Sequence, residues 1–168
     1  DFTAKDVHYT MNLMLTNPEA PSNGYYQQIF ESIELVDDYT IKIVTKNSFP
    51  LLAESIGVLI WGNDLRVVPE HIYAQQENPL IFKDSNPVVT GPYTVKQYDE
   101  LGNWILYELR EDAQFSDVGV VTGMVPQAKY VLFQTFGDDA TRTMTMLSNL
   151  VDIMVEVSPE NWEVMQGN

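Results

Sequence analysis

The chain contains no cysteine among its 168 residues. Disulfide bonds, thiol catalysis and zinc sites with cysteine ligands are therefore excluded. Its two histidines, His8 and His71, lie far apart and have no companion at metal-ligand spacing. Basic residues are also scarce, because 9 Lys and Arg stand against 24 Asp and Glu and give a formal net charge of −15. Nucleic acids and anionic membranes bind through clustered Lys and Arg, so this composition argues against both partners.

The acidic excess has two interpretations. It keeps a protein soluble, or it attracts a cationic ligand by long-range electrostatics.

Hydrophobic residues make up 45% of the chain and aromatic residues 11%, which is enough apolar material for a core and is unlike a disordered chain. No apolar run approaches the roughly 20 residues of a membrane-spanning helix. Residues 1–5 lack the basic and apolar regions of a signal peptide.

No motif of a known catalytic chemistry is present. The sequence has no glycine-rich phosphate loop and no GxSxG motif around a nucleophilic serine. Ser55, Asp64 and His71 supply the residue types of a hydrolytic triad, but their spacing gives no support for one. Alternating aspartates at calcium-loop spacing are missing as well. The sequence therefore predicts no catalytic residues, no metal site and no cofactor.

Hydrophobic periodicity and turn residues predict a mixed order of elements. Thr3 and Asp6 resemble a capping box that starts a helix, which Asn17 and Pro18 end. Further along, the pattern predicts helical turns at 25–30, a hairpin of strands 33–36 and 40–45, and short helices at 51–58 and from Pro69 to residue 75. This half of the chain is predicted to combine helices with one hairpin.

The second half has a similar mixture. We expect a hairpin of strands 93–98 and 104–109, a loop over 114–127, strands at 130–134 and 151–155, and helices at 138–150 and after Ser158. Gly91 precedes Pro92 and is predicted to need a backbone angle or a close approach that other residues avoid. A loop near residue 86 separates the halves, which predicts domains at 1–86 and 87–168. The fold class is α+β (mixed α/β).

Trp61 and Asn63 are the first candidates for ligand contacts. Trp61 ends an apolar run and is followed by Gly62, Asn63 and Asp64, a polar turn that predicts a position near the surface. Aromatic side chains in clefts commonly hold sugars and peptides, while a few polar groups fix their orientation.

Four stretches resemble the peptide-, nickel- and oligosaccharide-binding class of bacterial solute-binding proteins. They are FTAKDVHYTMN at 2–12, VDDYT at 36–40, VVPEH at 67–71 and PVVTGPY at 87–93. Each is similar to a motif of that family, and their order also suits it. The likeness fades beyond residue 110, where REDAQF stands in place of the family's segment R-N-P-x-Y-W.

The resemblance implies a fold and a function. It implies a periplasmic-binding-protein-like fragment that holds an accessory domain (1–86) and part of the first lobe (87–168), since family members are longer and close two lobes over a ligand. It implies capture of an oligopeptide or oligosaccharide outside the cytoplasm, in the periplasm or as a cell-surface lipoprotein, and transfer to an ABC permease without catalysis.

One further contact follows from the same resemblance. The family uses residues just after the strand predicted at 151–155, and that position is Glu156 here; strand ends that open into helices are common ligand sites in α/β proteins. Two other functions stay open. A sensor subunit would signal to a partner protein on ligand closure, and a hydrolase would turn over a peptide or glycoside.

Overall fold

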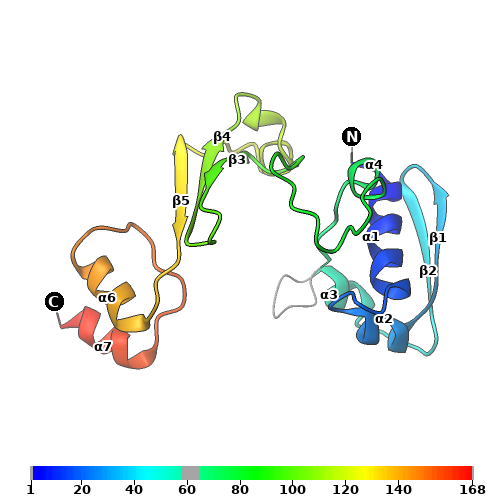
Figure 1. Ribbon diagram of the computed structural model, residues 1–168, viewed down its shortest axis with the longest axis horizontal. Helices are drawn as coiled ribbons and strands as arrows, with labels where there is room; N and C mark the ends of the chain where they lie inside the picture. Colours follow the sequence, from blue (N-terminus) through cyan, green and yellow to red (C-terminus); the bar gives the residue numbers. More distant parts are fainter. Residues whose placement is uncertain (1, 58–64, 168) are drawn as a thin grey trace. The chain divides into compact units, whose positions relative to one another are not determined.

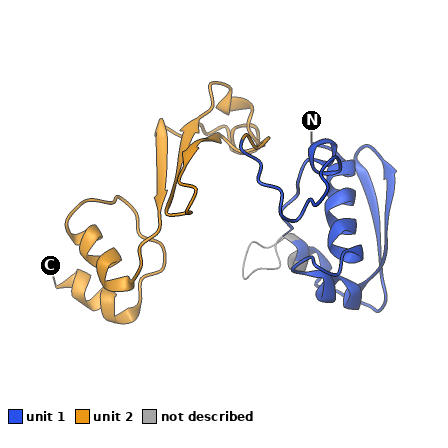
Figure 2. Ribbon diagram, in the orientation of Figure 1, with its two compact units in different colours: residues 1–85 blue, residues 86–168 orange. Residues whose placement is uncertain are grey.

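A computed structural model describes residues 2–57 and 65–167 of the chain. The chain divides into two compact units, Asp1–Ser85 and Asn86–Asn168, which Figure 2 colours separately. Both units combine helices with antiparallel strands, so the predicted mixed fold class is confirmed. The identity of the units as accessory domain and lobe stays a prediction. In the described residues, no helix has the length and apolar character needed to cross a membrane.

The first unit is built on helix α1 (Ala4–Thr16). Thr3 caps its first turn, and the side chain of Asp6 completes the capping box by accepting a hydrogen bond from the Thr3 backbone. Such a box satisfies N–H groups that a helix start otherwise leaves without partners. The predicted helix start is thus confirmed residue by residue.

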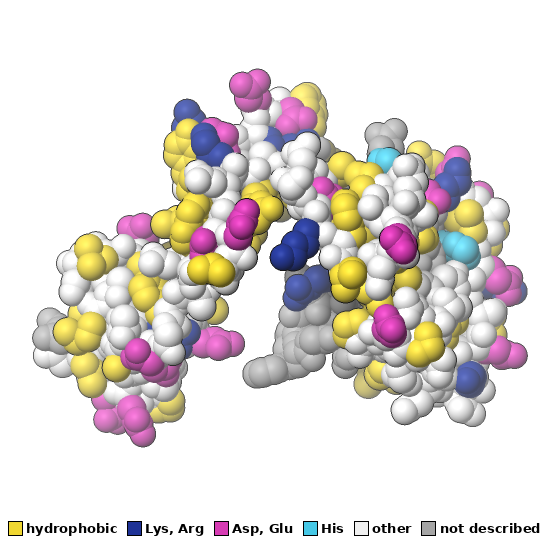
Figure 3. All heavy atoms as spheres, in the orientation of Figure 1, with side chains coloured by type: hydrophobic (Ala, Val, Ile, Leu, Met, Phe, Trp, Pro, Cys, Tyr) yellow, Lys and Arg dark blue, Asp and Glu magenta, His cyan; other side chains and the backbone are white. Residues whose placement is uncertain are grey.

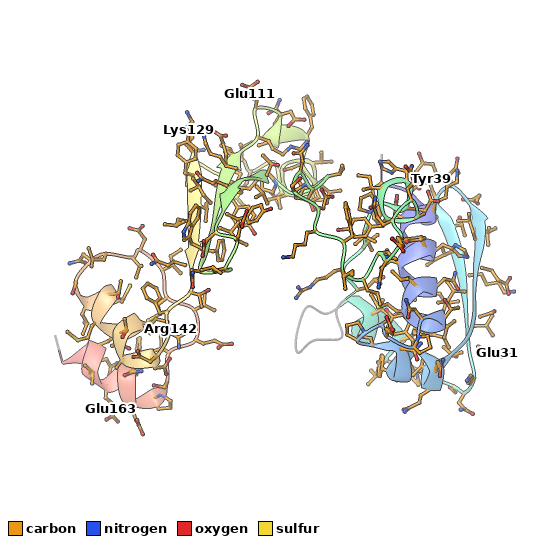
Figure 4. The ribbon with its side chains drawn as sticks, viewed as in Figure 1. Glu31, Tyr39, Glu111, Lys129, Arg142 and Glu163 are labelled. Carbon is orange, nitrogen blue, oxygen red and sulfur yellow. The ribbon has the colours of Figure 1, made fainter. Side chains whose placement is uncertain are left out.

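A hairpin of β1 (Phe30–Asp37) and β2 (Thr40–Thr45) packs against α1, as Figure 1 shows. The predicted turn is confirmed, with Tyr39 at its tip in Figure 4. Helix α2 (Asn23–Ile29) leads directly into β1. The core joins these elements through Met11 of α1, Tyr26 of α2, and Phe30 and Ile33 of β1.

Two short helices complete the first unit. Helix α3 (Leu52–Gly57) contributes Leu52 and Ile56 to the edge of the core. Helix α4 (Glu70–Tyr73) starts immediately after Pro69, a residue that cannot donate a backbone hydrogen bond and is tolerated at helix starts. Tyr73 packs edge-on against Phe82 with ring centroids 5.2 Å apart. Both helices lie where the sequence predicted them.

The second unit contains a three-stranded antiparallel sheet in the order β3-β4-β5. The strands are β3 (Tyr93–Tyr98), β4 (Trp104–Leu109) and β5 (Tyr130–Gln134). All three lie where the sequence predicted strands. A bulge between Val95 and Gln97 shifts the register of β3 against β4.

The predicted loop over 114–127 is wrong as far as residue 122, because that stretch contains helical turns, whereas residues 124–127 are irregular as expected. A 3-10 turn η1 (Ala113–Phe115) leads into helix α5 (Asp117–Thr122), and Gly123 ends it at a φ of 70°. Ser116 is buried and its Oγ accepts a hydrogen bond from the Gly119 N–H at 3.1 Å. This N-cap stabilises a helix too short to show a hydrophobic period.

Helices α6 (Asp139–Leu147) and α7 (Pro159–Gln166) were predicted and are present. The strand predicted at 151–155 is wrong, since these residues are irregular. Asn149 turns the chain at a φ of 55°, and Ile153 is 81% exposed. A short apolar segment forms a strand only where a neighbouring strand supplies hydrogen bonds and packing, and no described strand lies beside this segment.

Gly91 is not constrained in the predicted way. A Cβ atom added there would meet no other atom within 4 Å, and its φ lies outside the left-handed region. The crowded glycine is Gly119, where an added Cβ would lie 2.6 Å from the backbone oxygen of Gln114.

Candidate ligand-binding site

The structure describes one of the three predicted contact residues, Glu156. Trp61 and Asn63 lie outside the described residues. Glu156 is exposed and adopts a φ of 61°, a left-handed conformation that costs non-glycine residues energy and often marks functional positions. It does not follow a strand, so the expected strand-end geometry is absent at Glu156. A ligand-binding role for all three residues stays a prediction.

A groove of about 730 Å³ lies along α1 in the first unit. One wall is a stripe of α1 that includes His8, Tyr9 and Leu13, and the other comes from β1 through Ile33 and Leu35. Lys5, Asn12, Thr16 and Glu70 complete the lining. An apolar floor with a few polar groups at the rim is typical of small-molecule sites. The groove can therefore hold an apolar group of a ligand, although sequence reasoning did not single it out.

Glu70 acts electrostatically on Tyr9, another residue of the groove lining. Burial raises the pKa of Tyr9, and the negative charge of Glu70 adds to that rise. Tyr9 therefore stays a neutral hydrogen-bonding group at physiological pH.

Two polar residues of α1 hold the segment that carries Glu70. Thr10 is buried; its hydroxyl donates to the Asp6 carbonyl at 2.8 Å and accepts from the Val68 N–H at 3.1 Å. The Asp6 carboxylate accepts from the Glu70 N–H at 2.9 Å. Burial alone would raise the pKa of Asp6, but hydrogen bonds from Glu70 and Thr3, with the nearby His71, hold that pKa below its ordinary value.

A charged cluster lies on the sheet of the second unit. Lys96 Nζ donates to Glu108 Oε1 at 2.9 Å and to the Tyr130 hydroxyl at 3.1 Å, and lies 4.4 Å from the centre of the Tyr130 ring. The hydrogen bond from Lys96 lowers the pKa of Glu108, and the same bond raises the pKa of Lys96. Lys129, at the start of β5 in Figure 4, lies 5.3 Å from the same ring. The pairing balances charge and gives no residue the properties of a general acid or base.

Arg110 fixes the loop that contains the PVVTGPY stretch. Its Nη1 donates to the carbonyls of Val89 and Gly91 at 3.1 and 3.0 Å, while its Nε and Nη2 each donate to the Asp112 carboxylate at 2.9 Å. A planar guanidinium suits this forked arrangement. Sequence reasoning missed this role, because the partners are backbone carbonyls about 20 residues away.

In the stretches 2–57 and 65–167, no three His, Asp or Glu side chains gather closely enough to hold a metal ion. Lys5 and Lys96 are paired with carboxylates, Lys5 with Asp38 at 3.3 Å and Lys96 with Glu108 at 2.9 Å. The arrangement supports non-covalent contact through apolar, aromatic and hydrogen-bonding groups.

Comparison with known families gives a match along the whole chain. The family profile described as bacterial extracellular solute-binding proteins, family 5, middle region, matches residues 1–168. A search of curated protein sequences finds no significant match.

Solved structures share the fold at low sequence identity. A dipeptide-binding protein from a Pseudoalteromonas species, in complex with Met-Leu, has a TM-score of 0.69 at 17% identity over 100% of this chain. The Bacillus subtilis oligopeptide-binding protein AppA, in complex with a nonapeptide, has 0.67 at 17% over 90%. A mannohexaose-bound oligopeptide ABC transporter protein from Thermotoga maritima has 0.67 at 21% over 90%. This chain spans only 33%, 28% and 26% of those three proteins.

Proposed function

This chain belongs to the bacterial extracellular solute-binding proteins of family 5, and we propose that it is the part of such a protein that helps to capture an oligopeptide or oligosaccharide. Capture takes place outside the cytoplasm, in the periplasm or at the cell surface on a lipid anchor. The ligand then passes chemically unchanged to an ABC permease in the membrane.

The family match over residues 1–168 is the observation that carries this proposal. The proposed ligand class follows the fold neighbours, which are bound to a nonapeptide, a dipeptide and mannohexaose. Capture without reaction is proposed because the matched family is one of solute-binding proteins. Binding by aromatic contacts and a few hydrogen bonds needs no residue with catalytic properties.

Trp61, Asn63 and Glu156 are the proposed ligand contacts. Trp61 would stack on a sugar ring or an apolar side chain, and Asn63 would supply hydrogen bonds beside it. Glu156 would accept hydrogen bonds from a peptide amine, a basic side chain or a sugar hydroxyl.

The proposal is tested by calorimetry on the natural gene product with two probes, a nonapeptide library and mannohexaose. We expect saturable binding of one probe class, with mass spectrometry showing the recovered probe unchanged. Trp61→Ala and Glu156→Ala should each weaken that binding by about 1–3 kcal/mol, whereas Trp162→Ala, an exposed residue of α7, should not. A cleaved probe, or no binding of either class, would refute the proposal.

A further inference from the structure

The pair Asn23-Gly24 is the one place in the chain where glycine follows asparagine. Such a pair is open to an intramolecular reaction, because glycine has no Cβ to shield its backbone nitrogen. The Gly24 nitrogen attacks Asn23 Cγ and forms a cyclic imide, while the Cγ–Nδ2 bond breaks and ammonia leaves with the former Gly24 amide proton. Water then opens the imide at one of its two carbonyl carbons. The product is aspartate or, where the main chain runs on through Cγ, isoaspartate.

The fold directs the Asn23 side chain away from this reaction. Asn23 is the first residue of α2 and is only 8% exposed. Its amide nitrogen donates to the carbonyls of Met14 and Leu15, both at 2.9 Å. Side chains of a helix point back toward its N-terminus, so Asn23 Cγ is directed away from the Gly24 nitrogen. Gly24 itself is exposed, and the barrier to reaction is therefore the direction of the Asn23 side chain.

The two carbonyl partners explain why this side chain is held firmly. Met14 and Leu15 lie in the last turn of α1, where backbone carbonyls have no partner within the helix. A primary amide has two N–H groups and can donate one to each carbonyl. The Asn23 backbone is also held, because its N–H donates to the Ala20 carbonyl at 3.0 Å. Attack by the Gly24 nitrogen thus requires a local opening of the junction between α1 and α2.

The reaction products do not fit the place of Asn23. An aspartate carboxylate has no hydrogen to donate to the two carbonyls, and isoaspartate adds a carbon to the main chain at the start of α2. Tyr26 and Phe30, which follow closely in the sequence, are 4% and 1% exposed and belong to the core. The reaction also adds a negative charge to a chain of net charge −15, and Figure 3 shows acidic side chains on both units. Nothing in this charge balance favours the modified chain.

We propose that Asn23 is a modification site that the fold keeps closed: it is converted only when the junction between α1 and α2 opens, and the product prevents the first unit from refolding. Unfolding then becomes irreversible with time through chemistry at one side chain. Asn47 offers an internal comparison, because it is exposed and lies outside the described helices and strands. It precedes Ser48, whose side chain shields the attacking nitrogen more than glycine does. Unfolding should therefore reverse the order in which Asn23 and Asn47 react.

The test holds the natural gene product at mildly alkaline pH, both natively and in guanidinium chloride. Mass spectrometry of the peptides that carry Asn23 or Asn47 follows the replacement of amide by carboxyl. In denaturant we expect Asn23 to react faster than Asn47. In the native protein we expect Asn23 to react more slowly than Asn47, and at least about tenfold more slowly than in denaturant. Equal native and denatured rates at Asn23, or a native rate above that of Asn47, would overturn the proposal.

Gly24→Ala tests the effect on refolding. A Cβ added at residue 24 would meet no other atom within 4 Å, so the variant should fold, while the added methyl group hinders attack by the backbone nitrogen. After increasing times in denaturant, the natural protein should refold with a falling yield that follows the modified fraction at Asn23, whereas Gly24→Ala should keep its initial yield. Parallel losses in both proteins, or recovery of the native fold by chains modified at Asn23, would contradict the proposal.

Discussion

The carboxylate of Asp6 accepts a hydrogen bond of 2.9 Å from the backbone N–H of Glu70, so it joins the first turn of α1 to the first residue of α4. The same carboxylate accepts from the Thr3 N–H at 2.8 Å. The buried side chain of Asp6 therefore accepts hydrogen bonds at the starts of two helices, although Asp6 and Glu70 are 64 residues apart in the sequence. A negative charge is favourable at both positions, because helix N-termini carry partial positive charge.

The Asp6 contacts predict a pH-dependent contribution to stability. Because the folded pKa of Asp6 lies below its ordinary value near 3.8, its contribution is complete above that value and is lost as the pH falls through the folded pKa. We expect Asp6→Asn to lower the free energy of unfolding by about 1–3 kcal/mol at pH 7. Urea unfolding at pH 7 and pH 3 should show this difference narrowing in acid. A difference that stays constant would contradict the assignment.

Asn23 is predicted to stabilise the end of α1. Its buried side-chain amide donates to the carbonyls of Met14 and Leu15, both at 2.9 Å. Asn23→Asp keeps the shape but replaces the donor with an acceptor, and we expect a loss of about 1–3 kcal/mol in denaturant unfolding. Gln27→Ala is the matched control, because Gln27 is exposed and reaches the same Leu15 carbonyl at only 3.5 Å. Similar losses for both variants would show that the Asn23 hydrogen bonds stabilise the fold no more than the long Gln27 contact does.

Gly119→Ala should destabilise the second unit, whereas Gly91→Ala should not. An added Cβ at residue 119 would lie 2.6 Å from Gln114 O and 2.7 Å from Ala113 O, and backbone cannot move aside cheaply. We expect a loss of about 1–3 kcal/mol for Gly119→Ala and a change within about 0.5 kcal/mol for Gly91→Ala. Thermal unfolding of the two variants side by side measures the contrast, and the reverse order would refute it.

Glu156 is predicted to lower the stability of the folded protein while it contributes to ligand binding. Its φ of 61° suits glycine, so Glu156→Gly should raise the free energy of unfolding by about 0.5–1 kcal/mol, after the greater freedom of unfolded glycine is allowed for. Glu156→Ala keeps the strain and should not stabilise. If the carboxylate contacts ligand, both variants bind more weakly. Unfolding and calorimetry on the same samples separate the two effects, and unchanged affinity in both variants would remove Glu156 from the site.

Elements with their own local signals could be predicted from the sequence. Thr3 and Asp6 indicated the start of α1, and alternating apolar residues around compact turns indicated both hairpins. The stretch 151–155 is also rich in apolar residues, yet it forms no strand because strand formation depends on neighbours that its own residues do not specify.

Contacts between distant segments could not be predicted. Asn23 reaches carbonyls in the preceding helix, and Arg110 reaches carbonyls near Gly91. Backbone acceptors look the same in every sequence, so nothing in the residue types indicates such partners. Among the candidate ligand contacts, only the unusual backbone at Glu156 adds an observation that the sequence did not contain.

The bonds from Asp6 and Thr10 to Glu70 and Val68 also set an order of events during synthesis. Helix α1 leaves the ribosome before its polar partners, which follow 58 and 64 residues later. At 5–20 residues per second, the wait for Glu70 lasts roughly 3–13 s. Until then, two polar side chains destined for burial remain hydrated on a nascent helix, and closing the loop carries an entropic cost. The emergence of residues 68–70 is therefore the step at which Asp6 and Thr10 can first form these hydrogen bonds.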